Sequence, residues 1–172
     1  MINFLKTDYL KTGNHKQQKV YQVLVDNHVL EKLSNFTPIL VGTIPINIDI
    51  ASSDLDIICY VLEKETFVDT LNNNFGKEKS FIISENPVLN SIKANFFIGN
   101  FEFEIFGQNI ETAQQNAYQH MIIEHKILLE KGEKFREEII KLKEEGIKTE
   151  PAFAKLLGLE GNPYEELLKF DF

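Results

Sequence analysis

Apolar residues recur at helical spacing near the start of the chain, in a short middle segment and throughout the last third. The segments between them contain short apolar runs or alternating apolar and polar residues, which is typical of β-strands. The polar triplet Asp26-Asn27-His28 interrupts the first helical stretch, so we expect a long helix followed by a short one. In chain order, the pattern predicts helices within 17–33, strands at 38–41 and 55–61, a helix at 65–75 and a short edge strand at 81–83.

The segment after the first predicted strand alternates with a period of two. Isoleucine occupies positions 44, 46, 48 and 50, and Pro45, Asn47 and Asp49 lie between them. A period of two places all four isoleucines on one face of an extended chain. We therefore expect a half-buried strand or an extended arm here, followed by a turn at Ser52-Ser53.

The dipeptide Gly99-Asn100 lies between two apolar stretches and predicts a tight β-hairpin that joins strands at 91–98 and 101–106. A two-residue turn fixes the register, so that Ile98 faces Phe101 and directly opposed residues share a face. One face of the hairpin is then apolar and suited to the core: Ile92, Ala94, Phe96, Ile98, Phe101, Phe103 and Ile105. The other face is mixed: Lys93, Asn95, Phe97, Glu102, Glu104 and Phe106.

From residue 110 onward the pattern is helical, with one helix at 111–131, a second that follows it and two short ones near the end. The residues that mark the boundaries of these helices are Gly132, Gly146, Gly158, the expected caps Thr149 and Asn162, and Pro163. Strands followed by helices predict an α+β fold with a mixed β-sheet flanked by helices. We expect a core at 1–109 with N-terminal helices and a helical part at 110–172 that packs on it as one structural unit.

The composition restricts the functions that this chain can serve. Its 172 residues include 18 basic and 26 acidic side chains, which give a net charge of −8, and Arg136 is the only arginine. We do not expect a nucleic-acid partner, because such proteins need basic surface to neutralise phosphates. A single Cys59 excludes an internal disulfide, and no apolar run reaches the roughly 20 residues of a membrane span. We therefore expect a cytoplasmic protein with no membrane partner.

The strongest chemical signal combines a glycine turn with two nearby aspartates. Gly42-Thr43 follows the first predicted strand, and Asp54 and Asp56 lie at the start of the next one. On a strand the two aspartates point the same way, with Cα atoms about 6.6 Å apart. Carboxylates held this close repel each other unless a cation compensates them, so the pair predicts one or two divalent metal ions. Glycine and a hydroxyl at a strand end suit a triphosphate, because the backbone can approach the phosphates closely.

A third carboxylate is expected from the mixed face of the hairpin. If the second hairpin strand lies beside the aspartate strand with the same facing, Glu102, Glu104 or both would join the aspartates. The spacing alone leaves this choice open. For Glu102, an exposed position fits the pattern as well as a ligand position does. For Lys93, a cross-strand ion pair is favoured over contact with a triphosphate.

This arrangement resembles the signature of the nucleotidyltransferase superfamily, which includes DNA polymerase β and the enzymes that adenylylate aminoglycosides. The signature is a strand ending in Gly-Ser or Gly-Thr, then Asp-x-Asp on the next strand and a carboxylate on a later strand. The resemblance implies a nucleotidyltransferase-like mixed sheet, and it implies that Asp54, Asp56 and Glu104 are catalytic residues that hold Mg²⁺ or Mn²⁺. It further implies a group of residues that contact the phosphates of an NTP: Gly42, Thr43 and Ser53.

Longer stretches are similar to an uncharacterised bacterial family within this superfamily, known only as a domain of unknown function. Five segments that span most of the chain resemble it: 42–46, 53–59, 104–108, 115–121 and 148–154. The similarity suggests that Asn116 and Tyr118 line the cleft, and His120, Glu102 and Lys93 are further candidates. For His120, a local hydrogen bond with Glu124 is the favoured interpretation.

Together these residues predict a metal-dependent nucleotidyltransferase that moves an NMP group from an NTP to an acceptor hydroxyl on a small molecule or a protein. Two alternatives stay open: a catalytically inactive module that binds nucleotides or proteins, and a metal-dependent phosphoester hydrolase. The intact aspartate pair favours catalysis. The strand-like alternation after Thr43 departs from the short helix that is common in the superfamily. Arg136 and Lys148 are weaker candidates for phosphate contacts.

Overall fold

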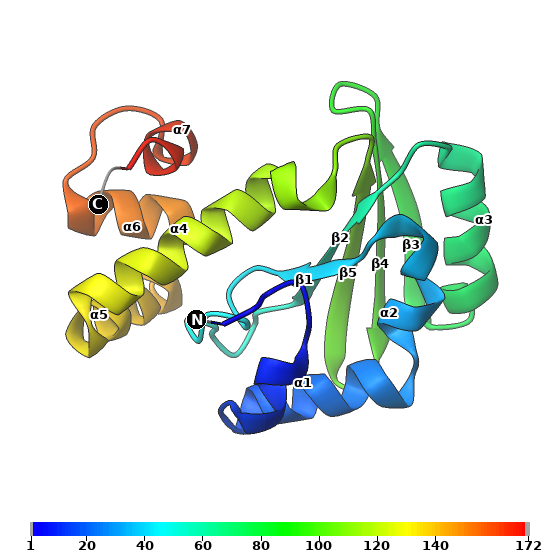
Figure 1. Ribbon diagram of the computed structural model, residues 1–172, viewed down its shortest axis with the longest axis horizontal. Coiled ribbons are helices and arrows are strands. Elements are labelled where there is room, and N and C mark those ends of the chain that lie inside the picture. Colours follow the sequence, from blue (N-terminus) through cyan, green and yellow to red (C-terminus); the bar gives the residue numbers. More distant parts are fainter. Residues whose placement is uncertain (1, 171–172) are drawn as a thin grey trace. The chain divides into compact units, whose positions relative to one another are not determined.

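The computed structural model describes residues 2–170 (Figure 1). Contacts within the chain divide it into two compact units: unit 1 comprises Met1–Val41 and Asp54–Gln115, and unit 2 comprises Gly42–Ser53 and Asn116–Phe172. The passage from unit 1 to unit 2 at Gln115-Asn116 lies near the boundary expected at residue 110. The loop between the first two strands, however, groups with the C-terminal helices. That the C-terminal part packs on the core stays a prediction.

Unit 1 contains a mixed five-stranded sheet with the order β1-β2-β5-β4-β3. β2 and β5 are parallel, and the other neighbouring pairs are antiparallel. The hairpin register is confirmed, since Ile98 pairs with Phe101 and Asn95 pairs with Glu104. The strands are β1 (Ile39–Val41), β2 (Leu55–Tyr60), β3 (Lys79–Asn86), β4 (Ser91–Ile98) and β5 (Phe101–Gln108). β3 lies at the edge as expected but is longer than predicted.

The helices predicted in unit 1 are present, although the first begins at His15 rather than at residue 17 and three short 3-10 segments were not predicted. The helix expected at 111–131 begins only at Asn116. His28 adopts a left-handed conformation (φ 52°) between α1 and α2, which explains the break expected at this point. A capping box formed by Asn14 and Gln17 begins α1. The helical segments are η1 (Asp8–Thr12), α1 (His15–Asp26), α2 (Val29–Lys32), η2 (Ser34–Phe36), α3 (Lys64–Phe75) and η3 (Thr112–Gln114).

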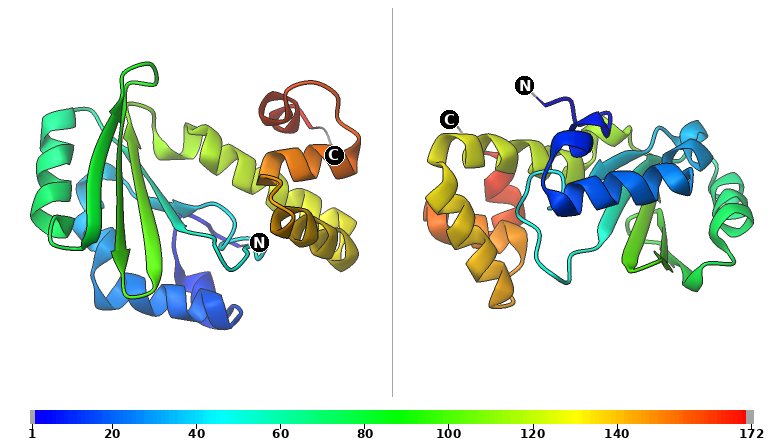
Figure 2. Two further views of the ribbon diagram at one scale, coloured as in Figure 1. Left: turned by 180° about the vertical axis from the view of Figure 1, so that it is seen from behind. Right: turned by 90° about the horizontal axis from the view of Figure 1, so that it is seen from below.

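Aromatic packing between α3 and one face of the sheet forms the core of unit 1. Phe75 stacks on Phe96 with ring centroids 4.8 Å apart, and Phe96 stacks on Phe103 at 5.3 Å. This is the apolar hairpin face expected from the sequence, although Phe101 is only half-buried. α2 and α3 lie on the same side of the sheet (Figure 2, left). The mixed face therefore projects to the opposite side.

The alternating segment is a series of turns, so the predicted strand or extended arm is wrong. The Asn47 N–H donates to the carbonyl of Ile44, and Asn47 has a left-handed φ of 59°. Pro45 has no N–H to offer a neighbouring strand, which disfavours sheet pairing. The isoleucines at 44, 46 and 48 are nevertheless buried, with at most 3% exposure. The burial of these three isoleucines was thus predicted correctly, but strict alternation was not, because Pro45 is also buried and Ile50 is only half-buried.

Unit 2 consists of the Gly42–Ser53 loop and four helices: α4 (Asn116–Lys131), α5 (Glu133–Glu144), α6 (Thr149–Leu157) and α7 (Pro163–Leu168). The Asn162 side chain caps α7 as expected, because it accepts a hydrogen bond from the Tyr164 N–H. Thr149 is not a cap: Lys148 already has the extended backbone of the capping position, and Thr149 begins α6. Within residues 2–170, no helix is long and apolar enough to cross a membrane.

Candidate functional site

Two carboxylates lie side by side on the parallel strands of unit 1. The register between β2 and β5 places Asp56 opposite Glu104. Opposed residues on neighbouring strands project to the same face, with Cα atoms about 4.8 Å apart. The adjacent residues Leu55, Ile57 and Phe103 project to the other face and are completely buried. Hydrophobic burial therefore fixes the direction in which the two carboxylates point.

The register favours Glu104 over Glu102 as the partner of the aspartates. The ladder between β2 and β5 begins at Leu55 and Phe103, so Asp54 and Glu102 lie just before its first pair. Asp54 is half-buried, whereas Glu102 is exposed. Of the two glutamates, Glu104 is thus the one aligned with a residue of the Asp-x-Asp motif.

Glu104 is also part of a cross-strand ion pair. The Lys93 ammonium donates to Glu104 Oε2 at 3.0 Å, which confirms the ion pair expected for Lys93. The two side chains are 42% and 28% exposed, respectively, so solvent screens the attraction and the pair contributes about 1 kcal/mol or less. Asn95 faces Glu104 directly on β4. The mixed face therefore holds two carboxylates, one ammonium group and one amide in neighbouring positions.

The Gly42–Ser53 loop of unit 2 is closed by its own hydroxyl groups. The Thr43 hydroxyl donates to Ser53 Oγ at 3.3 Å, and the Ile50 N–H donates to the same oxygen at 3.0 Å. Gly42 has a φ of 82°, a conformation that favours glycine because it has no Cβ. The two hydroxyls that were expected to contact a nucleotide thus lie together within this loop.

The donor groups of unit 1 suit a hard divalent cation, without forming a complete metal cage. Mg²⁺ prefers oxygen ligands and is often bound by one or two carboxylates together with substrate phosphates. Within the described residues, no three His, Cys, Asp or Glu side chains gather closely enough to hold a metal ion. Asp56 and Glu104 therefore fit a cation that is bound together with phosphate oxygens.

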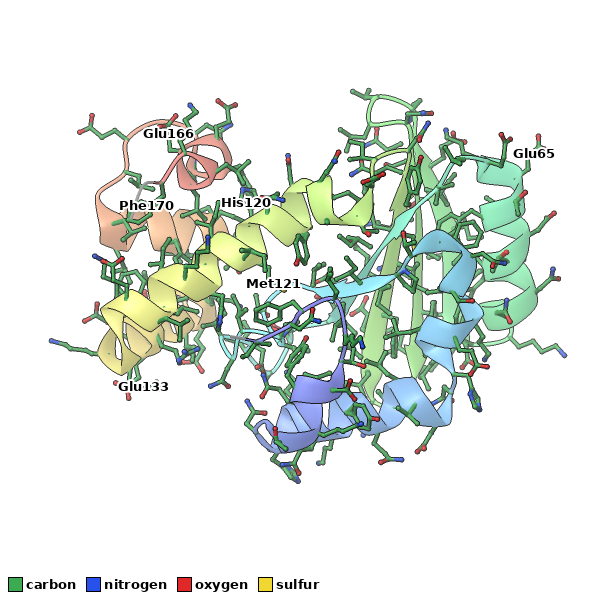
Figure 3. The ribbon with its side chains drawn as sticks, viewed as in Figure 1. Glu65, His120, Met121, Glu133, Glu166 and Phe170 are labelled. Atoms are coloured by element: carbon green, nitrogen blue, oxygen red, sulfur yellow. The ribbon has the colours of Figure 1, made fainter. Side chains whose placement is uncertain are left out.

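The structure places His120 among the helices of unit 2 (Figure 3). Its Nε2 donates to the carbonyl oxygen of Tyr164 at 2.8 Å, and its Nδ1 lies 3.6 Å from Glu150 Oε1. The residue is 7% exposed and links α4 to α6 and α7. The hydrogen bond expected with Glu124 is wrong, because the His120 ring is directed to other helices rather than along its own.

The two other cleft candidates lie in the first turn of α4. Asn116 is exposed and Tyr118 is half-buried. Their position at a helix start leaves side-chain groups accessible to a ligand. A role for Asn116 and Tyr118 in a cleft stays a prediction.

Glu124 is a buried carboxyl group whose unusual state was not inferred from the sequence. It is 4% exposed, and its Oε1 has no hydrogen-bond partner within the part of the chain that the structure describes. Burial raises the pKa of Glu124, the negative charge of Glu150 adds to this effect and the positive charge of Lys143 opposes it, and together they give a pKa of about 8. The available signal was its position between the apolar residues Met121 and Ile127 on α4.

Two cations of α5 bind main-chain carbonyls of the Gly42–Ser53 loop. Lys143, only 7% exposed, donates to the carbonyl of Ile48 at 2.6 Å. Arg136 Nη1 donates to the carbonyls of Ile46 and Asn47. No pattern in the sequence indicated these bonds, since the partners are about 90 residues apart in the chain.

Several solved structures share this fold. Three of them are of Cid1: the poly(U) polymerase with Mg and 3′-dATP bound, the polymerase with MgGTP bound, and Cid1 described for its RNA terminal uridylyl transferase activity. Their TM-scores are 0.60, 0.57 and 0.58, at sequence identities of 10%, 12% and 10%. The matched regions cover 94%, 80% and 80% of this chain. They cover 52%, 46% and 45% of the respective Cid1 chains.

The chain thus spans about half the length of the Cid1 chains that it matches. The likeness confirms the α+β, nucleotidyltransferase-like fold that the sequence predicted. No curated protein matches the sequence. A profile of DUF4269, described as a domain of unknown function, matches residues 22–170. The chain therefore belongs to the DUF4269 family.

Proposed function

We propose that this protein is a metal-dependent nucleotidyltransferase that moves an NMP group from an NTP to an acceptor hydroxyl on a small molecule or a protein. The alignment of Asp56 with Glu104 on adjacent parallel strands supports the proposal most directly. The fold resembles that of Cid1, whose structures hold nucleotides with Mg. The net charge of −8 supports an acceptor other than a nucleic acid.

The proposal assigns the metal ions to the carboxylates. Asp54, Asp56 and Glu104 would hold Mg²⁺ or Mn²⁺ together with phosphate oxygens of the NTP. When bound, such ions neutralise phosphate charge and align the attacking and leaving oxygens for in-line displacement. Lys93, which pairs with Glu104, is assigned a supporting role at the triphosphate.

The phosphates beyond the reacting one are assigned to the loop. Gly42, with its positive φ, lets backbone N–H groups approach a phosphate closely, and Thr43 and Ser53 supply hydroxyl donors. Chain connectivity supports the assignment, because Gly42 directly follows Val41, which pairs with Asp56. Ser53 in turn directly precedes Asp54.

In the proposed reaction, the acceptor hydroxyl oxygen forms a bond to the α-phosphorus of the NTP. The bond between that phosphorus and the oxygen bridging to the β-phosphate breaks, and pyrophosphate leaves. The hydroxyl proton passes to a nearby carboxylate, a task that we assign to Glu104. Because the chain contains one arginine, carboxylate-held cations are expected to neutralise most of the phosphate charge.

The melting temperature measured with each NTP, with and without Mg²⁺, tests the proposal. We expect an NTP-induced increase that requires Mg²⁺ in the unmodified protein and is lost in Asp56→Asn. Asp69→Asn is a matched control, because Asp69 is an exposed acid on α3 of the same unit. If no NTP shifts the melting temperature of the unmodified protein in the presence of Mg²⁺, the proposed function is wrong.

A second candidate is a module that binds nucleotides without catalysis. It is favoured by the Lys93–Glu104 ion pair, which gives Glu104 a structural partner independent of any reaction. The two functions differ in the fate of an α-labelled NTP incubated with small metabolites and proteins. Transfer of label that is reduced about 10²-fold or more in Asp56→Asn supports the enzyme. Nucleotide binding without transfer supports the module.

A further inference from the structure

Helix α5 holds three consecutive carbonyl groups of the Gly42–Ser53 loop. Arg136 Nη1 donates to the carbonyl oxygens of Ile46 at 2.6 Å and Asn47 at 3.1 Å. Lys143 Nζ donates to the carbonyl oxygen of Ile48 at 2.6 Å. Residues seven apart lie on the same face of a helix, so one face of α5 binds one continuous stretch of the loop backbone.

The bond from Lys143 to Ile48 is buried and the bond from Arg136 to Ile46 is partly buried, whereas the contact with Asn47 lies at the surface. The Lys143 residue is 7% exposed and the Arg136 side chain is 14% exposed. Hydrogen bonds from charged donors are stronger than those from neutral donors, and a low local dielectric strengthens them further. The side chains of Ile46 and Ile48 are also buried, so the loop is fixed through both its backbone and its side chains.

Two of the three anchored residues, Asn47 and Ile48, are bonded in turn to Ile44 and Thr43, which follow Gly42. The Ile48 N–H donates to the carbonyl of Thr43 at 3.1 Å, while the Ile48 carbonyl accepts from Lys143. The Asn47 N–H donates to the carbonyl of Ile44 at 3.2 Å, and the Asn47 carbonyl accepts from Arg136. Each cation is therefore connected through a single residue to the turn that contains Thr43.

We infer that Arg136 and Lys143 are positioning residues for the turn at Gly42-Thr43, so that α5 sets the affinity of the protein for the NTP. The inference rests on the proposed function, which assigns the phosphates to that turn. Arg136 was a weaker candidate for a phosphate contact in the sequence. Here its Nη1 binds the loop backbone, and the guanidinium acts on the nucleotide through Asn47 and Ile44.

The test compares Arg136→Gln and Lys143→Met with the unmodified protein, using Mg²⁺ with ATP, GTP, CTP or UTP as the probe. Each variant leaves loop carbonyls without their charged donor. We expect about a tenfold higher Kd for the bound NTP, and an increase in KM that is larger than the change in kcat. Hydrogen exchange at the amides of residues 42–53 should be faster in both variants, even without nucleotide.

Two kinds of variant control for nonspecific damage. Lys134→Gln and Lys141→Met change exposed cations on the same helix and should alter neither nucleotide affinity nor loop exchange. Arg136→Lys keeps the charge and one donor group, so it should restore part of the affinity that Arg136→Gln loses. If Lys143→Met does not fold, the Arg136 pair alone decides the question.

The outcomes separate this inference from the proposed function. If the unmodified protein binds NTP and Arg136→Gln binds it equally well, the inference is wrong and the proposed function stands. A lower affinity that Arg136→Lys does not improve at all, with unchanged loop exchange, also contradicts it. If the unmodified protein binds no NTP, the proposed function fails and the inference about affinity fails with it.

Discussion

At the scale of single residues, Glu124 is a carboxyl group that the fold removes from water. It lies within α4 with 4% exposure, and the groups that influence its charge are Glu150 on α6 and Lys143 on α5. Burial disfavours the ionised form, and the negative charge of Glu150 adds to this effect. With a pKa of about 8, Glu124 is mostly protonated at neutral pH.

The stability of the protein should therefore fall as the pH rises from about 4.5 to about 8. An unfolded glutamate loses its proton near pH 4.5, while folded Glu124 keeps its proton up to about pH 8. The folded state holds one more proton in this interval, so the free energy of unfolding decreases with rising pH. One pKa unit corresponds to about 1.4 kcal/mol, so the loss across the interval is at most about 5 kcal/mol. Glu124→Gln should remove this contribution to the slope.

Denaturant unfolding at pH 5, 6.5 and 8.5 measures this effect. We expect Glu124→Gln to be more stable than the unmodified protein at pH 8.5, with a difference that shrinks toward pH 5. Glu137→Gln, an exposed acid on α5, is the control and should leave the pH dependence unchanged. If the free energy of unfolding changes equally with pH in the Glu124→Gln and unmodified proteins, the raised pKa of Glu124 is contradicted.

Glu102 and Glu104 make a second residue-scale comparison. Only Glu104 is aligned with Asp56, and only Glu104 pairs with Lys93. We expect Glu104→Gln to reduce the Mg²⁺-dependent NTP shift in melting temperature and to lower transfer about 10²-fold. Glu102→Gln, at an exposed position, should change neither. Equal and negligible effects of both variants would exclude both as the third carboxylate.

At the scale of elements, Gly107 allows α3 to approach the sheet. A Cβ at this position of β5 would lie 2.4 Å from Phe67 Cε1 and 2.7 Å from Val61 Cγ2. Phe67 is completely buried, so it has little room to move. Gly107→Ala should therefore destabilise the protein by roughly 1–3 kcal/mol through overpacking.

A double-mutant cycle separates this clash from other effects of the substitution. Phe67→Leu removes the ring atoms that the new methyl group would meet, so the double variant should lose less stability than the sum of the single changes. The measurement is the free energy of unfolding of all four proteins. Strict additivity would mean that the helix is not held at this distance by the contact between Gly107 and Phe67.

Elements determined by residues close together in the sequence could be predicted, and those that depend on distant residues could not. The hairpin register was predicted correctly, because Gly99-Asn100 fixes it locally, although β5 extends to Gln108 rather than to residue 106. The strand predicted at 44–50 was wrong: the isoleucines at 44, 46 and 48 are buried, but the chain turns at Pro45 and at the left-handed Asn47. Apolar alternation in the sequence does not distinguish a strand from a compact loop that buries the same side chains.

In the candidate site, too, local features could be predicted from the sequence and long-range contacts could not. The hairpin register showed that Glu102 and Glu104 lie on the mixed face of the sheet. It did not show which of them lies beside Asp56, because that depends on the parallel pairing of β2 with β5, which joins residues nearly 50 positions apart. The bonds from Arg136 and Lys143 to the loop join residues still farther apart. Charged side chains in a helical pattern ordinarily indicate a solvated face, so nothing in the spacing marked these two as anchors.

At the scale of the whole molecule, the net charge bears on the acceptor. The structures of Cid1 that share this fold are described for a poly(U) polymerase and an RNA terminal uridylyl transferase activity. This chain spans about half the length of those proteins and has a net charge of −8. A strand of RNA would bring further negative charge to an acidic protein with 18 cationic side chains.

We therefore expect that an oligo(U) strand is not extended when the protein is incubated with UTP and Mg²⁺ or Mn²⁺. The measurement is the length of a 5′-labelled strand on a denaturing gel, at low salt, where any electrostatic attraction to RNA would be strongest. Asp56→Asn serves as the blank, because it removes a proposed metal ligand. Extension by the unmodified protein alone would support the nucleotidyltransferase chemistry while overturning the acceptor class. In that case, most acidic side chains would have to lie away from the mixed face of the sheet. RNA could then reach this face, where Lys93 lies beside Glu104.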